Sequence, residues 1–141
     1  RDAGTDVFVL DCSVTMAWIF DDAEDPLAAA VRDRLAGDVA LAPSIWPLEV
    51  GNALLAAERR ERVSRAEALR FLEVLGQLPI EVDATEVMVA PARTLQIARE
   101  TGVSAYDASY LELAARFGVP LATLDRRLAA AAVQVGVALC E

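Results

Sequence analysis

Short apolar runs alternate with amphipathic segments along the whole chain. The first run, Val7–Leu10, is apolar on both faces, which is typical of a central parallel strand covered by helices on each side. Four further runs predict strands at Val39–Ala42, Ile80–Val82, Pro120–Leu124 and Val137–Leu139. Strands that alternate with helices predict an α/β fold, here a three-layer sandwich with a mostly parallel sheet of four to five strands and helices on both faces.

Capping and turn residues mark the helices between these strands. Asp25 followed by Pro26 has the chemistry of an N-cap and a first helical position. Ser64 and Glu67 have the spacing of a capping box, so a helical hairpin is expected around this point. The remaining helices are expected to begin near Ser13, Ser44, Thr85, Ser104 and Arg126.

The length of 141 residues predicts one domain, residues 1–141, that is large enough to bury a core. Hydrophobic residues make up 55% of the chain, which favours a partner or a second copy on part of the surface. No apolar stretch reaches the length of about 20 residues that a bilayer span needs, and the start lacks a signal-peptide pattern. With two cysteines on different strands, Cys12 and Cys140, we expect a cytoplasmic protein without membrane attachment.

Two absent residue types limit the chemistry. The chain has no histidine, which excludes Ser/His/Asp and Cys/His sites, and all 13 basic residues are arginine, which excludes a P-loop or a Schiff base. Carboxylates must therefore carry any catalysis, and carboxylates without imidazole usually act through a hard metal ion. The net charge of −9 opposes diffuse attraction to nucleic acid, so such binding would need a local track of arginines and a metal.

Four acidic residues stand out from the solvated majority. Asp11 and Asp125 each follow a predicted strand, whereas Asp107 and Glu49 lie on apolar helices. Because neighbouring strands of a parallel sheet end at the same edge, the two strand-end aspartates should lie close together. Clustered carboxylates raise one another's pKa and destabilise the fold unless a divalent cation lies between them. Mg²⁺ or Mn²⁺ fits such oxygen ligands and supports phosphodiester chemistry.

Each aspartate also has a purely structural alternative. Asp11 and Asp125 could cap the helices that follow them, and Ser104 with Asp107 has the spacing of a capping box. Glu49 is harder to explain structurally, because an unpaired charge among apolar residues costs several kcal/mol. The joint pattern favours one shared site.

Four segments carry a resemblance to a known family. In order, they are Val9-Leu10-Asp11-Cys12-Ser13, Pro47-Leu48-Glu49-Val50-Gly51-Asn52-Ala53-Leu54, Tyr106-Asp107-Ala108-Ser109-Tyr110-Leu111-Glu112-Leu113-Ala114 and Thr123-Leu124-Asp125-Arg126-Arg127-Leu128. They resemble the signature blocks of PIN domains, in particular those of VapC toxins of type II toxin-antitoxin modules. The resemblance covers nearly the whole chain.

The resemblance implies a Mg²⁺-dependent endoribonuclease, with Mn²⁺ as an alternative metal. It implies a catalytic and metal-binding quartet in which Asp11 and Asp107 are the main ligands, completed by Glu49 and Asp125. Ser13 and Thr123 are expected to orient these groups. The resemblance also implies a homodimer, and a cognate antitoxin that covers the acidic groove with a basic or aromatic segment. Apolar residues on the hairpin Ile45–Leu78 are a candidate docking surface, with the core as the alternative place for most of them.

Several alternatives stay open at this point. Arg126 and Arg127 are candidates for contacts with RNA phosphates, or they are simply solvated helix-face residues. A catalytically inactive PIN-like interaction module is the alternative from another functional class. A dehalogenase-type phosphatase would need a second aspartate where Ser13 stands, and it shares with a receiver domain the need for a lysine that is absent here. Transfer, ribosomal and messenger RNA all remain candidate substrates.

Overall fold

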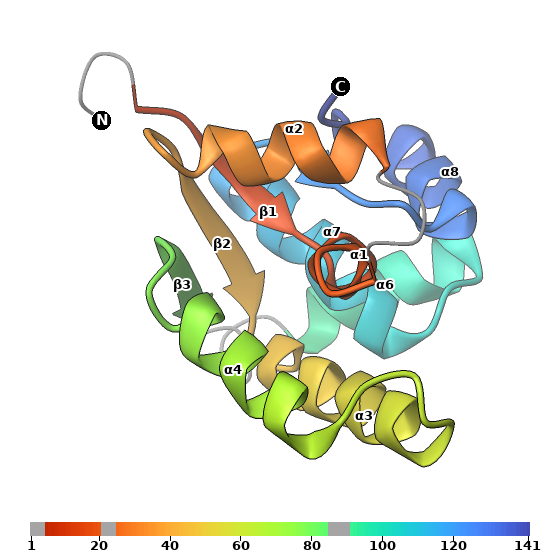
Figure 1. The fold of residues 1–141 in the computed structure, drawn as a ribbon. Coiled ribbons are helices and arrows are strands. Elements are labelled where there is room, and N and C mark those ends of the chain that lie inside the picture. Colours follow the sequence, from red (N-terminus) through yellow and green to blue (C-terminus); the bar gives the residue numbers. More distant parts are fainter. Residues whose placement is uncertain (1–4, 21–24, 85–90) are drawn as a thin grey trace.

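The middle layer of the molecule is a four-stranded, fully parallel sheet with the order β3-β2-β1-β4 (Figure 1). This computed structural model describes residues 5–20, 25–84 and 91–141. The strands are β1 (Val7–Leu10), β2 (Val39–Pro43), β3 (Ile80–Asp83) and β4 (Leu121–Ala122). The first strand therefore lies at the centre, paired with β2 on one side and β4 on the other.

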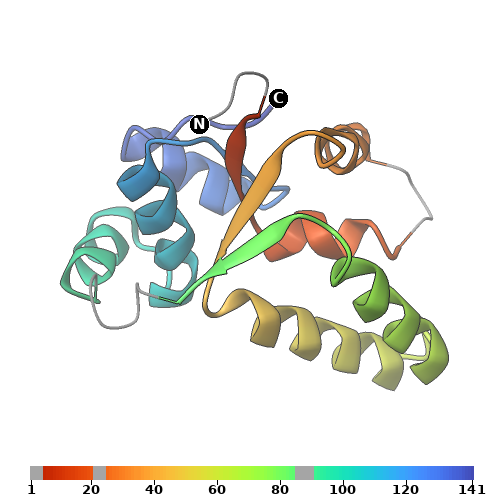
Figure 2. The same cartoon turned by 90° about the vertical axis from the view of Figure 1, so that its left-hand side faces the viewer.

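Helices cover both faces of this sheet. They are α1 (Cys12–Ala17), α2 (Pro26–Arg34), α3 (Trp46–Arg59), α4 (Arg65–Leu75), α6 (Pro91–Thr101), α7 (Ala105–Phe117) and α8 (Arg126–Gln134). Figure 2 shows α6, α7 and α8 on one side of the strands and α1 to α4 on the other. The predicted three-layer α/β sandwich is confirmed, with α7 packed across β1, β2 and β4.

The core explains why β1 is central. Phe8, Val9 and Leu10 are completely buried, as expected for a strand with helices on both faces. The neighbouring strand contributes small buried side chains, Ala40 and Ala42, which let the helices approach closely. The end of β1 is thus anchored by a strand that is buried on both faces.

The predicted caps are present. Asp25 accepts hydrogen bonds from two N–H groups of α2, and Ser64 with Glu67 forms a complete capping box at α4. Gly118 ends α7 in the left-handed region with φ 65°, a conformation that costs glycine nothing. Local signals therefore determine these helix ends.

Four sequence expectations need correction or lie outside the described residues. The last predicted strand, Val137–Leu139, is reduced to a single bridge between Leu121 and Leu139, so the sheet has four strands in the described residues. The predicted strand Pro120–Leu124 is shortened to β4, because beyond Ala122 the Thr123 hydroxyl and the Leu124 N–H bind the side chains of Asp11 and Ser13. The predicted helix starting at Thr85 is described only as α6, since residues 85–90 are outside the described ranges. The acidic residues of the segment 21–24 predict a solvated turn, and this segment is also outside the described ranges.

No helix in the described part of the chain combines the length and the apolarity that crossing a bilayer would require.

Candidate functional site

The carboxyl ends of β1 and β4 meet at one edge of the sheet, and Asp11 lies there. Its backbone N–H donates to the carbonyl of Ala122 over 3.0 Å, which extends the pairing with β4 one residue beyond the end of β1. The hydroxyls of Ser13 and Thr123 both donate to Asp11 Oδ2, over 2.6 and 2.7 Å. The structure thus brings three of the residues singled out from the sequence into direct contact.

The two hydroxyls are themselves held in a defined orientation. Ser13 Oγ accepts a hydrogen bond from the backbone N–H of Leu124, and Thr123 Oγ1 accepts one from the N–H of Asp125. Each hydroxyl has a single hydrogen, and the accepted bond leaves that hydrogen for the Asp11 carboxylate. The loop after β4 therefore fixes the direction of the Asp11 side chain.

Asp11 is a buried carboxylate, with 6% of its surface exposed. It occupies the N-cap position of α1, where its side chain makes no capping hydrogen bond of normal geometry, although the backbone groups of Cys12 and Ser13 lie close enough to lower its pKa. Burial raises the pKa of Asp11 above its ordinary value, and the hydrogen bonds from Ser13 and Thr123 oppose that rise. The fold therefore keeps this carboxylate buried with only partial compensation from hydrogen bonds.

Two helices bring further carboxylates toward Asp11. Glu49 lies in the first turn of α3, and Asp107 lies in the first turn of α7, whose N-terminus is capped by Ser104. Burial raises the pKa of Glu49, and the charges of Asp11 and Asp107 raise it further. The hydrogen bond from the Tyr110 hydroxyl lowers this pKa and so opposes part of the rise. Burial also raises the pKa of Asp107, with added contributions from Asp11 and Asp125. All four predicted acidic residues therefore lie in one electrostatic neighbourhood.

Asp125 differs from the other three because its side chain is exposed and caps α8. Its Oδ1 accepts hydrogen bonds from the backbone N–H groups of Arg127 and Leu128, over 2.9 and 3.2 Å. For Asp125 the capping alternative is therefore correct, and the residue still lies close enough to raise the pKa of Asp107.

The two arginines after Asp125 have different surroundings. The Arg127 guanidinium donates to the carbonyl of Gly102 over 3.3 Å. Its positive charge lowers the pKa of Asp107, but by less than burial, Asp11 and Asp125 raise it. Arg126 is exposed on the first turn of α8. Arg127 is therefore part of the surroundings of the acidic site, whereas Arg126 faces solvent.

The donor chemistry of this edge fits a hard divalent cation. The hydroxyl oxygens of Ser13 and Thr123 contact Asp11. The negative charge of Asp11 raises the pKa of both Glu49 and Asp107, as expected for neighbouring carboxylates, and carboxylate oxygens are ligands that such a cation prefers. Burial and the neighbouring charges of Glu49 and Asp11 raise the pKa of the Cys12 thiol to about 12, so this half-buried sulfur stays neutral.

No group of three or more acidic or cysteine side chains is already arranged to hold a metal in the described residues. Mg²⁺ keeps several waters and needs only one or two direct carboxylates, so such an arrangement is not required.

Some residues that shape the site were not singled out from the sequence. Tyr110 is completely buried and donates its hydroxyl to Glu49 Oε1 over 2.5 Å. Trp46 Nε1 donates to Thr15 Oγ1 over 3.0 Å, which ties the start of α3 to α1. For Tyr110, a signal was present in the sequence: it follows Asp107 by three residues, so the two side chains must lie on the same face of the helix.

Comparison with known proteins agrees with this architecture. The PIN domain family matches residues 8–134. Ribonuclease VapC12 of Mycobacterium tuberculosis is 34% identical over 123 residues, which cover 87% of this chain and 90% of that protein. Ribonuclease VapC1 of the same species is 33% identical, over 86% of this chain and 90% of that protein.

Solved structures show the same fold. PAE2754 from Pyrobaculum aerophilum superposes with a TM-score of 0.68 at 27% identity, over 90% of this chain and 86% of that one. VapBC2 from Rickettsia felis, bound to a DNA fragment from its promoter, gives a TM-score of 0.66 at 12% identity, over 95% and 97% of the two chains. FitAcB from Neisseria gonorrhoeae gives 0.58 at 18% identity, over 95% and 96%. From the match over residues 8–134 and the identity to the two VapC proteins, the chain belongs to the PIN domain family, among its VapC-type members.

Proposed function

We propose that this chain is a Mg²⁺-dependent endoribonuclease that hydrolyses RNA phosphodiester bonds, with Mn²⁺ as an alternative metal. The observation that carries the proposal is the buried Asp11 carboxylate, which the hydroxyls of Ser13 and Thr123 hold at the edge of the sheet. The charges of Asp11 and Asp107 both raise the pKa of Glu49, so these three carboxylates interact electrostatically. Two relatives that cover most of the chain are named ribonucleases. These features support a hydrolytic site that works through carboxylates and an ion.

Each acidic residue has a role in the proposal. Asp11 and Asp107 would hold the ion, which when bound would supply Lewis acidity toward a phosphate oxygen and activate water. Glu49 completes the oxygen ligands or accepts the proton that the attacking water releases. Asp125 contributes negative charge from the start of α8, while Ser13 and Thr123 keep Asp11 in place.

Removal of one ligand charge tests the proposal. Asp11→Asn and Asp107→Asn should each lower Mg²⁺-dependent cleavage of RNA by at least about 100-fold, because the ion contributes several kcal/mol to the transition state. Asp33→Asn, on the exposed face of α2, is the charge-matched control and should cleave like the unmodified chain. Calorimetry with Mg²⁺ and with Mn²⁺ should show binding that both site variants lose.

The same experiment separates the two functional classes. A catalytically inactive interaction module would show neither site-dependent metal binding nor turnover. Unaltered cleavage by Asp11→Asn or Asp107→Asn would refute the assigned ligands. Sequencing of the RNA ends produced by the active chain would then identify the RNA class.

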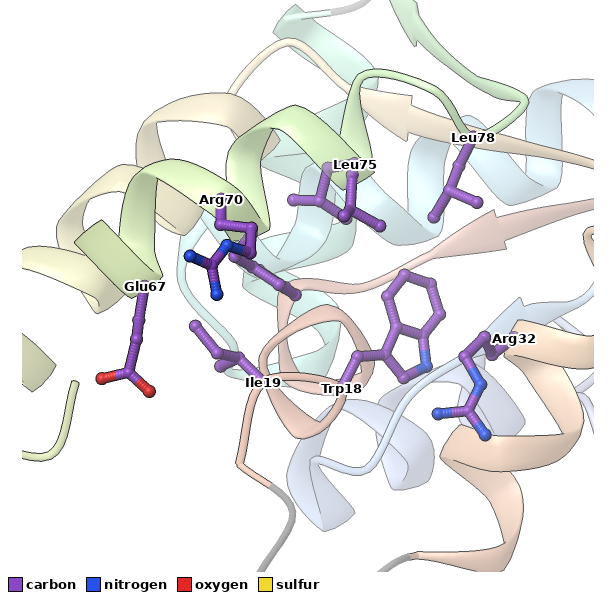
Figure 3. Close-up of a pocket in the computed structure, with 9 residues that line it drawn as sticks. Trp18, Ile19, Arg32, Glu67, Arg70, Leu75 and Leu78 are labelled. Atoms are coloured by element: carbon purple, nitrogen blue, oxygen red, sulfur yellow. The ribbon is translucent and has the colours of Figure 1, made fainter. Parts of the chain in front are cut away.

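We further propose that a cognate antitoxin binds the groove between α1 and α4. The names of two structural neighbours, VapBC2 and FitAcB, describe assemblies of this kind. In the present chain a pocket of about 350 Å³ lies beside α4, with an apolar floor and three charged side chains among the residues around it (Figure 3). Its residues are Trp18, Ile19, Arg32, Glu67, Arg70, Phe71, Val74, Leu75 and Leu78. An amphipathic antitoxin segment suits this combination.

A matched pair of substitutions tests the groove. Val74→Glu places a charge in the groove and should weaken antitoxin binding by at least tenfold, because a desolvated unpaired charge is costly. Val133→Glu, at an exposed position on α8, should bind as tightly as the unmodified chain. Equal affinities of the two variants, or no hydrogen-exchange protection of α4 in the complex, would exclude this groove.

We also propose a homodimer and a cytoplasmic location. Exposed apolar side chains on the α3–α4 hairpin, namely Leu48, Leu55, Leu69 and Leu72, support contact with a second copy. Both cysteines are free thiols, which agrees with a reducing compartment. Light scattering of the purified chain measures the oligomeric state, and a monomer at micromolar concentration would exclude the dimer.

A further inference from the structure

Tyr110 combines complete burial with a polar contact to the acidic site. None of its surface is exposed, and it packs in the centre of the sandwich on α7. A buried phenol needs a partner for its hydroxyl. That partner is Glu49 Oε1, at 2.5 Å, on a helix 61 residues earlier in the chain.

Without the hydrogen bond from Tyr110, the Glu49 carboxylate would be expected to turn away from the acidic site. Its half-buried carboxylate faces the negative charges of Asp11 and Asp107, and a glutamate side chain has three rotatable bonds through which it can turn toward solvent. Among the residues that the structure describes, Tyr110 is the hydrogen-bond donor to this carboxylate. The contact engages Oε1, so Oε2 is the oxygen that remains for another ligand.

The backbone positions on both sides of the contact are also fixed. Tyr110 lies one turn after Asp107, so α7 presents a proposed ligand and the phenol on one face. On the other side, the Trp46 indole donates to Thr15 Oγ1, whose hydroxyl contacts the Asp11 carbonyl over 3.4 Å. The start of α3 is thereby tied to the same strand end that carries Asp11.

We propose that Tyr110 is a positioning residue, whose hydroxyl holds Glu49 Oε1 and thereby leaves Oε2 available to an ion that Asp11 and Asp107 would hold. This inference rests on the proposed metal-dependent function. It assigns to α7 two separate tasks, ligation by Asp107 and orientation of Glu49 by Tyr110. It also predicts that the phenol acts on metal binding and not on contact with RNA.

The chain offers a matched pair of tyrosines for the test. Tyr110→Phe removes only the buried hydroxyl, while Tyr106→Phe removes a hydroxyl from a side chain that is 64% exposed on the same helix. Calorimetry with Mn²⁺ alone, without RNA, should show about 10- to 100-fold weaker binding for Tyr110→Phe, the usual effect of losing a group that orients a ligand. Tyr106→Phe should bind Mn²⁺ like the unmodified chain.

Kinetics separate positioning from a general structural effect. For Tyr110→Phe, the Mn²⁺ concentration that gives half-maximal cleavage should rise by the same factor as the dissociation constant, and high Mn²⁺ should restore the rate. The KM for RNA at saturating Mn²⁺ should stay within about twofold of the unmodified value. In a Glu49→Ala background, Tyr110→Phe should change Mn²⁺ binding no further, because the group that it orients is already gone.

A spectroscopic measurement covers the case in which Tyr110→Phe does not fold. The chain has two tyrosines, so Tyr106→Phe leaves Tyr110 as the single tyrosine. Addition of Mg²⁺ should then change the tyrosine ultraviolet difference spectrum, and the change should disappear when Glu49→Ala is added.

The outcomes separate the two levels of inference. If the unmodified chain binds Mn²⁺ and cleaves RNA, and Tyr110→Phe has the same Mn²⁺ affinity, the positioning role is wrong while the proposed function stands. An unchanged tyrosine spectrum on addition of Mg²⁺ would likewise overturn the positioning role. If the unmodified chain neither binds Mn²⁺ nor cleaves RNA, both inferences are wrong.

Discussion

Asp11 shows how one residue places function in conflict with stability. The fold keeps its carboxylate almost fully buried, and the hydroxyls of Ser13 and Thr123 compensate only part of the loss of solvation. Glu49 and Asp107 add like charges nearby, so the pKa of each of these three acids is raised. The metal-free protein therefore carries a local destabilisation at the place where the proposed ion binds.

Substitution of Asp11 should make this cost measurable. A carboxyl group whose pKa is raised by folding stabilises the folded state while it is protonated. That contribution is complete below the ordinary value of 3.8 and is lost as the pH rises through the raised folded pKa. In EDTA at neutral pH, Asp11→Asn should raise Tm by about 4 °C, or roughly 1 kcal/mol in a domain of this size.

Thermal melts at pH 4 and at pH 7.5 check this sign. The difference in Tm between Asp11→Asn and the unmodified chain should be larger at pH 7.5 than at pH 4. A lower Tm for Asp11→Asn at pH 7.5 would show that its hydrogen bonds outweigh the cost of burying the charge.

Arg126 gives a prediction about RNA contact. Its exposed side chain at the start of α8 lies next to Asp125, so Arg126→Ala should weaken RNA binding and lower the slope of log affinity against log salt by roughly 0.7 to 1. Arg65→Ala, on α4 at the distant hairpin (Figure 1), is the charge-matched control and should leave the slope unchanged. Filter binding over a salt series measures both, and equal slopes for the two variants would remove Arg126 from the RNA contact.

The residues of the site differ in how far the sequence could predict them. Asp11 and Asp125 were accessible because each follows an apolar strand, and neighbouring strand ends must meet. Tyr110 was not assigned a role, because its contact with Glu49 depends on how α3 and α7 pack across 61 residues of sequence. A spacing rule predicts the face of a helix, but the partner across that face is determined by tertiary packing.

At the level of elements, Arg116 connects α7 to the edge of the sheet. Its guanidinium donates to Glu112 on the same helix and to Asp83 at the end of β3, at 2.9 and 2.7 Å. The hydrogen bond with Glu112 raises the pKa of Arg116 most strongly, so the group stays charged. Glu112 is almost fully buried and needs this cation.

Removal of the cation should therefore be costly. Arg116→Met should lower the free energy of unfolding by about 2 kcal/mol, less than for a fully buried pair because the guanidinium is partly exposed. Arg99→Met, on the exposed face of α6, should stay within about 0.5 kcal/mol of the unmodified chain. Urea unfolding measures both variants.

A second variant checks the cause of that loss. Adding Glu112→Gln to Arg116→Met should recover part of the stability, because no unpaired charge remains buried. A double variant as unstable as the sum of its single changes would show that packing, and not the buried charge, explains the loss.

The elements were predictable where local chemistry determines them. Asp25 with Pro26, the Ser64 capping box and Gly118 all specify helix ends within a few residues. The extent of β4 was not predictable in this way. Thr123 and Leu124 continue an apolar run, but in the fold their polar groups bind Ser13 and Asp11. A long-range hydrogen-bond network therefore overrides the local strand pattern.

At the level of the whole molecule, the net charge of −9 and the acidic edge should make stability sensitive to divalent ions. Mg²⁺ at about 100 times its dissociation constant should stabilise the fold by about 2.7 kcal/mol, since the site exists only in the folded state. NaCl at equal ionic strength is the control, and Asp107→Asn should lose most of the gain. An equal rise in Tm with NaCl would show that only general screening is involved.

The pairing of β1 with β4 joins the beginning of the chain to its last quarter. Asp11 is held by Thr123, so the site is complete only when residues more than a hundred positions apart are both present. During translation, a nascent chain that has not yet extended past β4 contains Asp11, Glu49 and Asp107 but lacks the strand and the hydroxyl that organise them. The acidic site can therefore be organised only after the residues of β4 and Thr123 have been synthesised.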